Sequence, residues 1–301
     1  MENTKSEKLI NIHFIINPIA GSGNHKIDHA FLEGFFNPLA YAITTKYSEY
    51  KTHTTKLAQQ SVKDQADIIV ACGGDGTINE VASCIIGTSI LLGIIPLGSG
   101  NGLASNLGIP KNLNKVLNII TKQHVRVIDV GRLNDKFFFS NTGVGFDAYV
   151  IKNYEESNSR KLISYIRAFF KSFKNINDTR IIDISVNDKN YQVKPFMIFI
   201  SNSNELGYKV SLTPKASLVD GLLDILIVPK LNGFKILIFS LLMIFKKHHL
   251  LKEVKSIQTK QLTLHRKDFN HFKMQIDGEY QFIETNTIHI SIVEKTLEVI
   301  S

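Results

Sequence analysis

Hydrophobic and polar positions alternate in blocks along the first 125 residues. Three apolar runs, INIHFII, DIIVAC and LLGIIPL, are each followed by a glycine-containing turn and a stretch with helical periodicity. Strands that are apolar along their whole length are buried on both faces, and their alternation with helices is typical of a parallel sheet with right-handed crossovers. The pattern predicts an α/β domain over residues 1–125, with the three turns at one edge of the sheet.

After residue 125 the pattern changes to a series of runs typical of antiparallel strands. These runs are KFFFSNTGV, RIIDISVN, PFMIFISNS, LLDILIV, QLTLHR, FKMQID and TIHISIV. Helical periodicity interrupts them at residues 159–174 and 233–250. We therefore predict a β-rich second domain over residues 126–289, while the last strand, residues 290–301, could complete the first domain.

Composition narrows the class of protein but does not choose its partner. Hydrophobic residues make up 44% and charged residues 21% of the 301 residues, as in ordinary globular proteins. The longest apolar run, residues 236–245, lies between two lysines and is far shorter than the roughly 20 residues of a spanning helix. The N-terminus lacks the features of a secretory signal, and the two cysteines suit a reducing cytoplasm. The net charge of +8 favours nucleotides, nucleic acid or an acidic membrane surface as partners.

The candidate chemistry begins with the three glycine turns, at residues 17–24, 73–80 and 96–104. Glycines at a strand end let successive N–H groups point into one concavity, and the following helix adds its positive dipole end, so phosphate oxygens are stabilised there. One such turn is more often a simple connection, but three at one sheet edge favour a ligand site. The sequence has neither a Walker-type loop nor a dinucleotide fingerprint, so any phosphate site is of another kind.

Five motifs together carry a resemblance that spans nearly the whole chain. IINPIAGSG, GGDGTINEVA, GIIPLGSGNGLASNLGIP, LVDGLLDILIV and MQIDGEY occur in this order and resemble the soluble diacylglycerol kinase and sphingosine kinase family of lipid kinases. The resemblance implies an N-terminal three-layer α/β nucleotide-binding domain, of the type also found in NAD kinase. It further implies a C-terminal domain rich in β-sandwich structure that carries much of the lipid site.

The resemblance also implies which residues bind ATP. They come from all three turns, with Ser99 where many relatives have threonine, and from a hydroxyl expected after the second strand, for which Ser48 fits by spacing and Thr45 is the alternative. The implied contacts are Asn17, Pro18, Ile19, Ala20, Gly21, Ser48, Gly73, Gly74, Asp75, Gly76, Thr77, Ile78, Asn79 and Ser99.

Phosphoryl transfer also needs a group that accepts the proton of the attacking hydroxyl. In QIDGEY a strand end presents Asp277 and Glu279, and the resemblance implies that a carboxylate of this motif is that acceptor. We assign the role to Glu279, with Asp277 supporting it. The alternative is a plain Asp-Gly turn with solvated acids.

Two further acids are candidates for binding Mg²⁺. Asp75 would lie beside ATP phosphates, an arrangement that is favourable if a divalent metal bridges the two anions, so we assign Asp75 to the catalytic group as the residue that orients Mg-ATP. SLVDGLLD resembles a separate structural Mg²⁺ site of the family, formed by Asp220 with the carbonyls of Ser217 and Leu222. An ordinary Asp-Gly turn is the alternative for this second motif.

The third turn departs from the family pattern. Many bacterial relatives have an acid where this chain has Gly102. Sphingosine-kinase-like members also lack this acid, which favours a sphingoid base as the alternative substrate. The basic amphipathic pattern at residues 159–174 and the apolar one at 233–250 could lie on anionic lipid or pack on the sheet.

The sequence therefore predicts an ATP-dependent lipid kinase that phosphorylates a lipid hydroxyl, with diacylglycerol as the first candidate and a sphingoid base as the alternative. A soluble-substrate kinase of the NAD kinase type is disfavoured by the apolar helices. A non-catalytic regulator would be expected to lack Asp75 or Glu279, and both are present. Expected partners are ATP, Mg²⁺ and a lipid in or at a membrane, with no nucleic acid, and a homodimer stays open.

Overall fold

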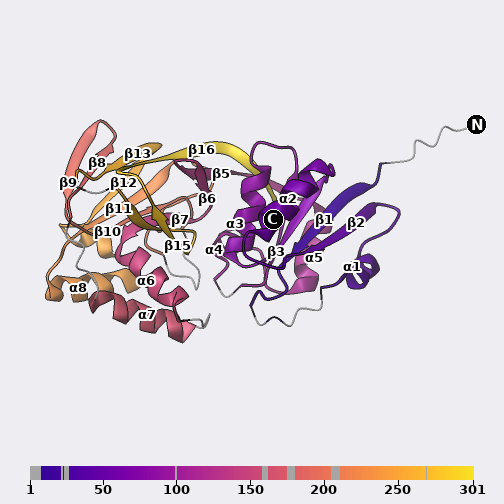
Figure 1. Ribbon diagram of the computed structural model, residues 1–301, viewed down its shortest axis with the longest axis horizontal. Coiled ribbons are helices and arrows are strands. Elements are labelled where there is room, and N and C mark those ends of the chain that lie inside the picture. Colours follow the sequence, from indigo (N-terminus) through magenta and orange to yellow (C-terminus); the bar gives the residue numbers. More distant parts are fainter. Residues whose placement is uncertain are drawn as a thin grey trace, which may run out of the picture. The chain divides into compact units, whose positions relative to one another are not determined.

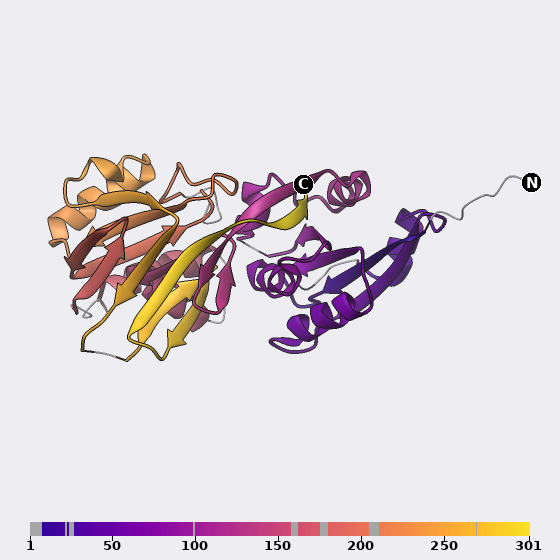
Figure 2. The same ribbon diagram turned by 90° about the horizontal axis from the view of Figure 1, so that it is seen from above.

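A computed structural model describes residues 8–21, 23, 27–98, 100–157, 162–174, 180–204, 211–268 and 270–301. The chain divides into two compact units (Figure 1). Unit 1 comprises Met1–Val127 and Thr296–Ser301, and unit 2 comprises Ile128–Lys295. Two long strands, β5 (Val125–Leu133) and β16 (Thr287–Ile300), pass from one unit to the other, and Figure 2 shows β16 in yellow as one uninterrupted strand.

Unit 1 contains a parallel sheet, as the sequence predicts. Its strands are β1 (Ile10–Ile16), β2 (Tyr41–Tyr47), β3 (Ile68–Gly73) and β4 (Leu91–Pro96). They lie in the order β2-β1-β3-β4, and the end of β16 lies parallel to β4 with Val299 opposite Leu92. Every residue of β3 is buried, which agrees with its apolar sequence.

In the described residues of unit 1, five helices connect the strands. They are α1 (His29–Phe35), α2 (His53–Lys63), α3 (Asp75–Ile85), α4 (Gly102–Asn106) and α5 (Leu113–Lys122). Side-chain caps begin two of them: the Asp28 carboxylate accepts the Phe31 amide of α1, and Asn112 does the same for α5. By contrast α3 follows Gly74 without a side-chain cap, so its first amides are left for other acceptors.

Unit 2 contains two sheets. The first has the strand order β12-β11-β10-β7-β14-β15 and is antiparallel throughout. Its strands are β7 (Asn141–Gly145), β10 (Pro195–Ser201), β11 (Leu223–Pro229), β12 (Lys255–Thr259), β14 (Phe272–Ile276) and β15 (Glu279–Ile283). In the second sheet the strand order is β16-β13-β8-β9, with β13 at Gln261–His265, β8 at Ile182–Val186 and β9 at Lys189–Val193. Strand β5 also pairs with β16, and β6 (Lys136–Phe138) pairs with β5.

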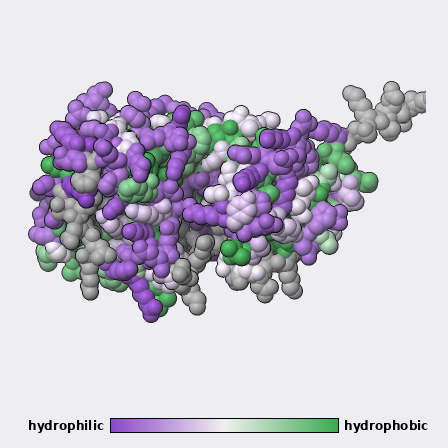
Figure 3. Space-filling view, viewed as in Figure 1, coloured by the Kyte–Doolittle hydropathy of each residue, from purple (hydrophilic) through white to green (hydrophobic). Residues whose placement is uncertain are grey.

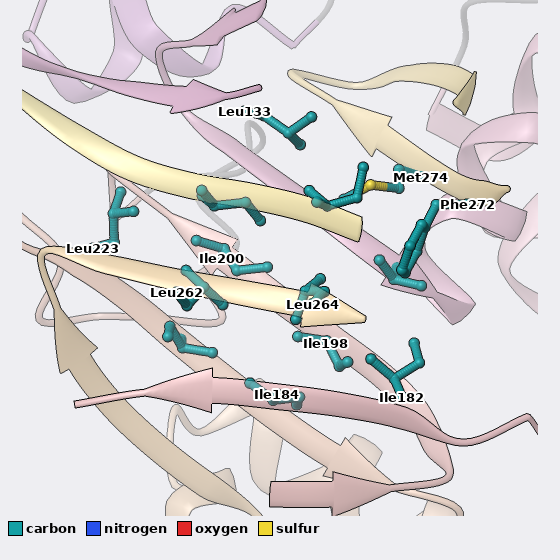
Figure 4. Packing of buried hydrophobic residues seen from close by; sticks show 14 of the residues in the cluster. Leu133, Ile182, Ile184, Ile198, Ile200, Leu223, Leu262, Leu264, Phe272 and Met274 are labelled. Carbon is teal, nitrogen blue, oxygen red and sulfur yellow. The ribbon is translucent and has the colours of Figure 1, made fainter. Parts of the chain in front are cut away.

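The two faces of the six-stranded sheet are covered differently. Along β10, Ile198 and Ile200 point into a core shared with the second sheet, where they pack with Ile184, Leu264 and Met274 (Figure 4). This face-to-face packing is the β-sandwich that the sequence predicts. The intervening residues of β10, such as Met197 and Phe199, point to the opposite face, because side chains alternate along a strand.

Three helices cover that opposite face, and we call the apolar cluster beneath them the outer cluster. The helices are α6 (Phe146–Glu155), α7 (Leu162–Lys174) and α8 (Gly233–Ile244). Phe146, Phe196 and Phe239 are buried in the outer cluster, and Tyr165, Phe169, Phe173, Ile236 and Met243 are partly buried against it. In the described part of the chain no helix is both long and apolar enough to cross a bilayer.

Some element boundaries differ from the sequence-based expectations. The helix expected at 233–250 ends at Ile244, because Lys246 adopts a left-handed conformation (φ 56°), and a short helix η1 (His248–Leu250) follows. Of the helix expected at 159–174, only the part from Leu162 falls within the described residues. The single run KFFFSNTGV forms two strands, β6 and β7, which belong to different sheets.

Candidate active site

The three glycine turns lie side by side at the carboxyl edge of the parallel sheet of unit 1. Cys72 in β3 is in register with both Ile16 of β1 and Ile95 of β4. Backbone hydrogen bonds continue into the turns: the Asn17 amide donates to the Cys72 carbonyl at 2.9 Å, and the Leu97 amide donates to the Gly73 carbonyl at 2.8 Å. The turns thus form one continuous surface at the place where α/β proteins bind ligands.

Side chains join the first turn to the second. The Asn17 Nδ2 donates to Thr77 Oγ1 at 3.3 Å, and its Oδ1 accepts the Ile19 amide at 3.2 Å. Thr77 lies close to Gly73, where a Cβ atom would stand 2.4 Å from that of the threonine. Gly73 is therefore required by the close packing of its own turn, and Asn17 keeps the first turn against it.

Asp75 joins the second turn to the third. Its Oδ2 accepts the Asn101 amide at 2.8 Å and its Oδ1 accepts the Gly102 amide at 2.7 Å. These donors lie at the start of α4, so the carboxylate satisfies backbone groups that the helix itself leaves unpaired. A carboxylate in a phosphate-type turn is thus explained first by the neighbouring turn, which it fixes in place.

The third turn approaches the second so closely that it needs glycine. A Cβ atom at Gly98 would lie 2.6 Å from the Gly74 Cα, and one at Gly100 would lie 3.0 Å from Asp75 Oδ2. Asn101 has a left-handed conformation (φ 55°) and its Oδ1 accepts the Gly98 amide at 3.0 Å. The contact at position 102 is made by the backbone amide, so it does not depend on the acid that many relatives carry there.

The remaining expected nucleotide contacts are placed as follows. Ser48 follows β2 at the same edge, and its amide donates to the Ile16 carbonyl at 2.9 Å, whereas the alternative Thr45 lies within β2. Ile19 is highly exposed and Ala20 is buried. Gly21 is left-handed (φ 60°). Ser99 lies outside the described residues. Of the other predicted contacts, Pro18 lies in the first glycine turn, and Gly76, Ile78 and Asn79 lie at the start of α3.

In unit 2, the Asp277 carboxylate organises a loop. It accepts the backbone amides of Phe139, Ser140 and Asn141 at 2.8, 2.8 and 3.0 Å. The Asp277 amide in turn donates to the Asn141 carbonyl at 2.8 Å. These bonds hold the segment between β6 and β7 against the Asp277–Gly278 turn, which is left-handed at both residues (φ 46° and 80°).

Glu279 begins β15, two residues after Asp277, and is half-buried. Within the part of the chain that the structure describes, no hydrogen bond or ion pair engages the Glu279 carboxylate, in contrast to the three amides at Asp277. The backbone of the next residue is fixed, because the Tyr280 amide donates to Glu155 Oε1 of α6 at 3.0 Å. Glu279 is therefore the acid of this turn that is available to a ligand.

A buried network behind this turn was missed by the sequence reasoning. Gln275 Nε2 donates to Asn141 Oδ1 at 2.7 Å and to Asp147 Oδ2 at 3.4 Å, and Gln275 Oε1 accepts the Gly278 amide at 3.0 Å. A Cβ atom at Gly143 would lie 1.9 Å from Asp147 Oδ2, so this carboxylate requires glycine beside it. The missed signal is GVGFDA, in which an acid follows a glycine at a strand end, as Asp75 does.

Asp147 is a half-buried residue in the first turn of α6, and one oxygen of its carboxyl group is fully buried. Its Oδ1 has no solvent-exposed surface and no hydrogen-bond partner among the described residues. Removal from water raises the pKa of Asp147 to about 7, and the interactions with the Ala148 backbone and with Gln275 oppose this only in part. The carboxyl group therefore changes its charge near neutral pH, next to the network that supports the Asp277–Gly278 turn.

The loop that contains Asp220 is held by a second buried acid that the sequence reasoning missed. The Asp129 carboxylate accepts the Gly221 amide at 2.8 Å and the Lys295 amide at 2.8 Å, and its own amide donates to the Leu218 carbonyl. Asp220 is exposed and its Oδ1 accepts the Leu222 amide at 3.1 Å. Gly221 is left-handed (φ 70°), which glycine adopts without strain.

The donors of this loop fit a hard cation. They are the exposed Asp220 carboxylate and the main-chain carbonyls of Ser217 and Leu222, which are the oxygen ligands that Mg²⁺ and Ca²⁺ take. Burial raises the pKa of the nearby Asp224 carboxyl group, and the negative charge of Asp220 adds to this increase. In the described residues no cluster of three or more His, Cys, Asp or Glu side chains could hold a metal, so any cation here would depend on carbonyls.

Comparison with known families decides the class of protein. Residues 11–133 match the diacylglycerol kinase catalytic domain, and residues 140–301 match the YegS C-terminal NAD kinase beta sandwich-like domain. The chain belongs to the diacylglycerol kinase family. It is a lipid kinase, which confirms the family and the enzyme class that the motifs predict.

Individual relatives of this kinase are distant in sequence. Proteins named diacylglycerol kinase from Staphylococcus haemolyticus (strain JCSC1435) and Staphylococcus aureus (strain JH9) are both 26% identical to it. The alignments cover 80% and 79% of this chain and 73% and 76% of those proteins. The fold is similar to a crystal structure described as "a putative diacylglycerol kinase from Bacillus anthracis str. Sterne", with a TM-score of 0.79, 24% identity and coverage of 100% and 98% of the two chains.

Proposed function

We propose that this lipid kinase transfers the γ-phosphate of ATP to the hydroxyl group of diacylglycerol. The observation that carries the proposal is the bonding of Asp75 to the Asn101 and Gly102 amides, which fixes the second and third glycine turns together. Three turns held at one sheet edge in front of helix N-termini form a surface that stabilises phosphate oxygens without a Walker-type loop.

The proposed nucleotide contacts are those of the three turns and Ser48. The first turn is joined to the second by Asn17 and Thr77, and Ser48 is joined to the end of β1, so the groups would be preorganised before ATP arrives. Ile19 is 81% exposed, as suits an apolar side chain that packs on a ligand rather than on the core.

We assign the proton-accepting role to Glu279. Asp277 is less suited to that role because three backbone amides already donate to its carboxylate, so we propose that it positions the turn. A general base needs a free carboxylate oxygen within hydrogen-bond reach of the attacking hydroxyl. The Glu279 carboxylate has no such amide donors among the described residues, and its backbone belongs to β15, which supports this assignment.

Mg²⁺ is the proposed metal. Carboxylate oxygens are ligands that Mg²⁺ takes, so we propose that Asp75 orients the bound ion directly or through one of its waters. When bound with ATP, the ion would neutralise phosphate charge during transfer. A second Mg²⁺ is proposed at Asp220 with the carbonyls of Ser217 and Leu222, where its role would be to order the loop that precedes β11.

Two observations support diacylglycerol as the proposed acceptor: the names of the related proteins and the apolar helices of this chain. The Staphylococcus proteins are named diacylglycerol kinases, and the product of such a reaction, a phosphorylated diacylglycerol, is an intermediate of the kind that phospholipid biosynthesis consumes. Gly102 keeps a sphingoid base as the second candidate, because sphingosine-kinase-like members share the lack of an acid there. We propose that the enzyme acts in the cytoplasm, at the membrane that holds its substrate.

The proposal is tested with radiolabelled ATP and Mg²⁺ against diacylglycerol, a sphingoid base and other lipids in mixed micelles, with NAD as a further acceptor. We expect phosphorylation of diacylglycerol in preference to all others. Labelling of the sphingoid base alone would show that the acceptor is a sphingoid base and not diacylglycerol. Labelling of NAD alone would overturn the proposal.

The role of Glu279 is tested with Glu279→Gln, which keeps the shape of the side chain and removes its basicity. We expect kcat to fall by roughly 10²- to 10⁴-fold, the usual contribution of a general base, with ATP affinity unchanged. Glu284→Gln is the matched control, since Glu284 is an exposed acid just after the same strand. A Glu279→Gln enzyme with more than a tenth of the wild-type kcat would show that another group takes the proton.

A further inference from the structure

The side of α8 that faces away from the sheet is lined with large apolar side chains. Phe234, Leu237, Leu241 and Phe245 recur at intervals of three and four residues, so they form one stripe along the helix. Their exposed fractions are 73%, 68%, 56% and 65%. A helix that only covers a sheet normally presents polar residues to water, so this stripe is not explained by packing within unit 2.

Helix α7 repeats the pattern. Ile163, Ile166 and Phe170 lie on one side of it with exposed fractions of 56%, 45% and 65%. The other sides of α7 and α8 are inserted into the same outer cluster, on the same face of the six-stranded sheet. The two exposed stripes therefore both face away from that sheet, and we call them together the apolar face.

Hydrophobic colouring agrees with this placement for α8. Green atoms appear along the lower left edge of the surface in Figure 3, at the position that α8 occupies in Figure 1. Purple atoms lie around them. An exposed apolar area with a polar rim is the usual appearance of an interaction site.

The rim of the apolar face is basic. The chain from Lys230 to Lys252 contains five lysines and neither Asp nor Glu. Lys246 and Lys247 are exposed directly after Phe245, where the left-handed turn ends the helix, and Arg167 is exposed on α7.

Among the described residues, two acids near this rim form ion pairs with lysines. Glu253 forms an ion pair with Lys235 at the start of α8. Glu156 of α6 pairs with Lys171 of α7 at 3.5 Å and with Lys152 at 4.0 Å. The acids therefore neutralise only part of the positive charge, and Lys246 and Lys247 remain next to the apolar stripe.

We propose that the apolar face docks this kinase onto an anionic lipid bilayer. Apolar side chains of α7 and α8 would enter the boundary between head groups and acyl chains, while the lysine side chains extend to lipid phosphates. The inference rests on the proposed function, since a diacylglycerol substrate is dissolved in that bilayer. A second copy of the chain is a poorer occupant, because facing copies would bring like charges together.

The test measures binding of the full-length protein to vesicles by co-sedimentation, without ATP. One set of vesicles is phosphatidylcholine, and the other contains phosphatidylcholine with about one third phosphatidylglycerol, a composition that gives the surface the negative potential on which basic segments depend. The variants are L237Q/L241Q/F245Q and K246E/K247E. The matched control is Leu39→Gln, which removes a leucine that is 84% exposed in unit 1.

We expect the wild type and Leu39→Gln to bind the anionic vesicles at least tenfold more strongly than the neutral ones. The triple variant should lose binding to both by at least tenfold, and K246E/K247E should lose the preference for anionic lipid. All variants should keep the wild-type thermal unfolding midpoint, because the changed side chains are exposed.

Three outcomes would overturn the proposal: equal binding by the triple variant and the wild type, no vesicle binding by the wild type, or a dimer in gel filtration that the triple variant dissociates. Kinase activity on a short-chain diacylglycerol that is soluble in water is measured in parallel. It separates the two proposals, because it requires the proposed reaction but no docking.

Discussion

At the residue scale, three carboxylates of this kinase accept hydrogen bonds from backbone amides. Asp75, Asp129 and Asp277 each accept two or three amides from segments distant in sequence. A carboxylate with several amide donors is a strong and directional anchor, since hydrogen bonds to a charged group are stronger than those between neutral groups. The acids of the motifs thus shape the loops in addition to any chemistry they perform.

Asp75→Ala is expected to reduce both activity and stability. Without the carboxylate, the Asn101 and Gly102 amides lose their acceptor, which costs roughly 1 to 3 kcal/mol for buried groups and releases the third turn. Turnover should fall below detection, and urea unfolding should show the loss of stability.

The matched control for this variant is Asp28→Ala, which also removes a carboxylate that caps a backbone amide, at the start of α1. It should cost about 1 kcal/mol and leave turnover unchanged. Loss of turnover in both variants would mean that reduced stability, and not the third turn, explains the effect of Asp75.

Asp147→Asn is expected to stabilise the protein, and increasingly so as the pH rises. The folded pKa of about 7 lies above the unfolded value of 3.8, so between these values the unfolded chain releases a proton that the folded protein keeps. Stability of the wild type therefore falls as pH increases from about 4 to about 7. Asparagine does not ionise, so its advantage should be small at pH 4 and on the order of 3 kcal/mol at pH 8.

Unfolding midpoints in urea at pH 4.5, 6 and 8 would measure this dependence. The exposed Asp135→Asn serves as the control and should show no such trend. A constant difference between Asp147→Asn and the wild type at all three values would show that Asp147 is charged throughout.

At the scale of elements, the β4–α4 turn approaches the β3–α3 turn too closely for a side chain at Gly98. Gly98→Ala places a methyl group 2.6 Å from the Gly74 Cα, and a backbone atom cannot move aside as a side chain can. We expect the third turn to shift and ATP affinity, measured by calorimetry, to fall by at least tenfold.

Gly34→Ala tests whether any added methyl group has this effect. A Cβ atom there meets nothing within 4 Å, and the position lies inside α1, so alanine should raise stability by about 0.5 to 1 kcal/mol. ATP affinity should be unchanged. Unaltered affinity in Gly98→Ala would show that nucleotide binding does not depend on the spacing of these two turns.

The sequence predicted elements well where a periodic pattern determined them. The parallel strands β1, β3 and β4 of unit 1 and most antiparallel strands of unit 2 follow from apolar runs and glycine turns, whereas β2 has no continuous apolar run. The end of α8 did not follow, because Phe245 and Lys246 are acceptable helix residues. The buried His248, which contacts the Phe239 ring at 6.0 Å, belongs to tertiary packing that no local pattern reports.

The candidate site likewise has a part that the sequence predicted and a part that it did not. The glycine turns were predictable because glycine is needed where backbones approach closely, as at Gly73 and Gly98. Asp129 and Asp147 were not identified, since their partners lie up to 166 residues away and only the fold brings them together. Long-range hydrogen bonds of this kind leave little trace in the spacing of a single sequence.

At the scale of the whole molecule, the chain passes between its two units twice. Unit 2 is an insertion into unit 1, which contains residues up to Val127 and again from Thr296. The six returning residues supply hydrogen bonds from the Gly87 amide to the Thr296 carbonyl and from the Ser301 amide to the His124 carbonyl. The two units are therefore joined covalently at both ends of unit 2.

This arrangement has a consequence for biosynthesis. Unit 1 contains all three glycine turns within its first 104 residues, yet its sheet gains its final strand only when Val299 reaches Leu92. At the usual 5 to 20 residues per second, the ribosome needs roughly 10 s or more to synthesise the intervening chain. During that interval the outer edge of β4 is uncovered, so the nascent protein carries an open strand edge until β16 pairs with it.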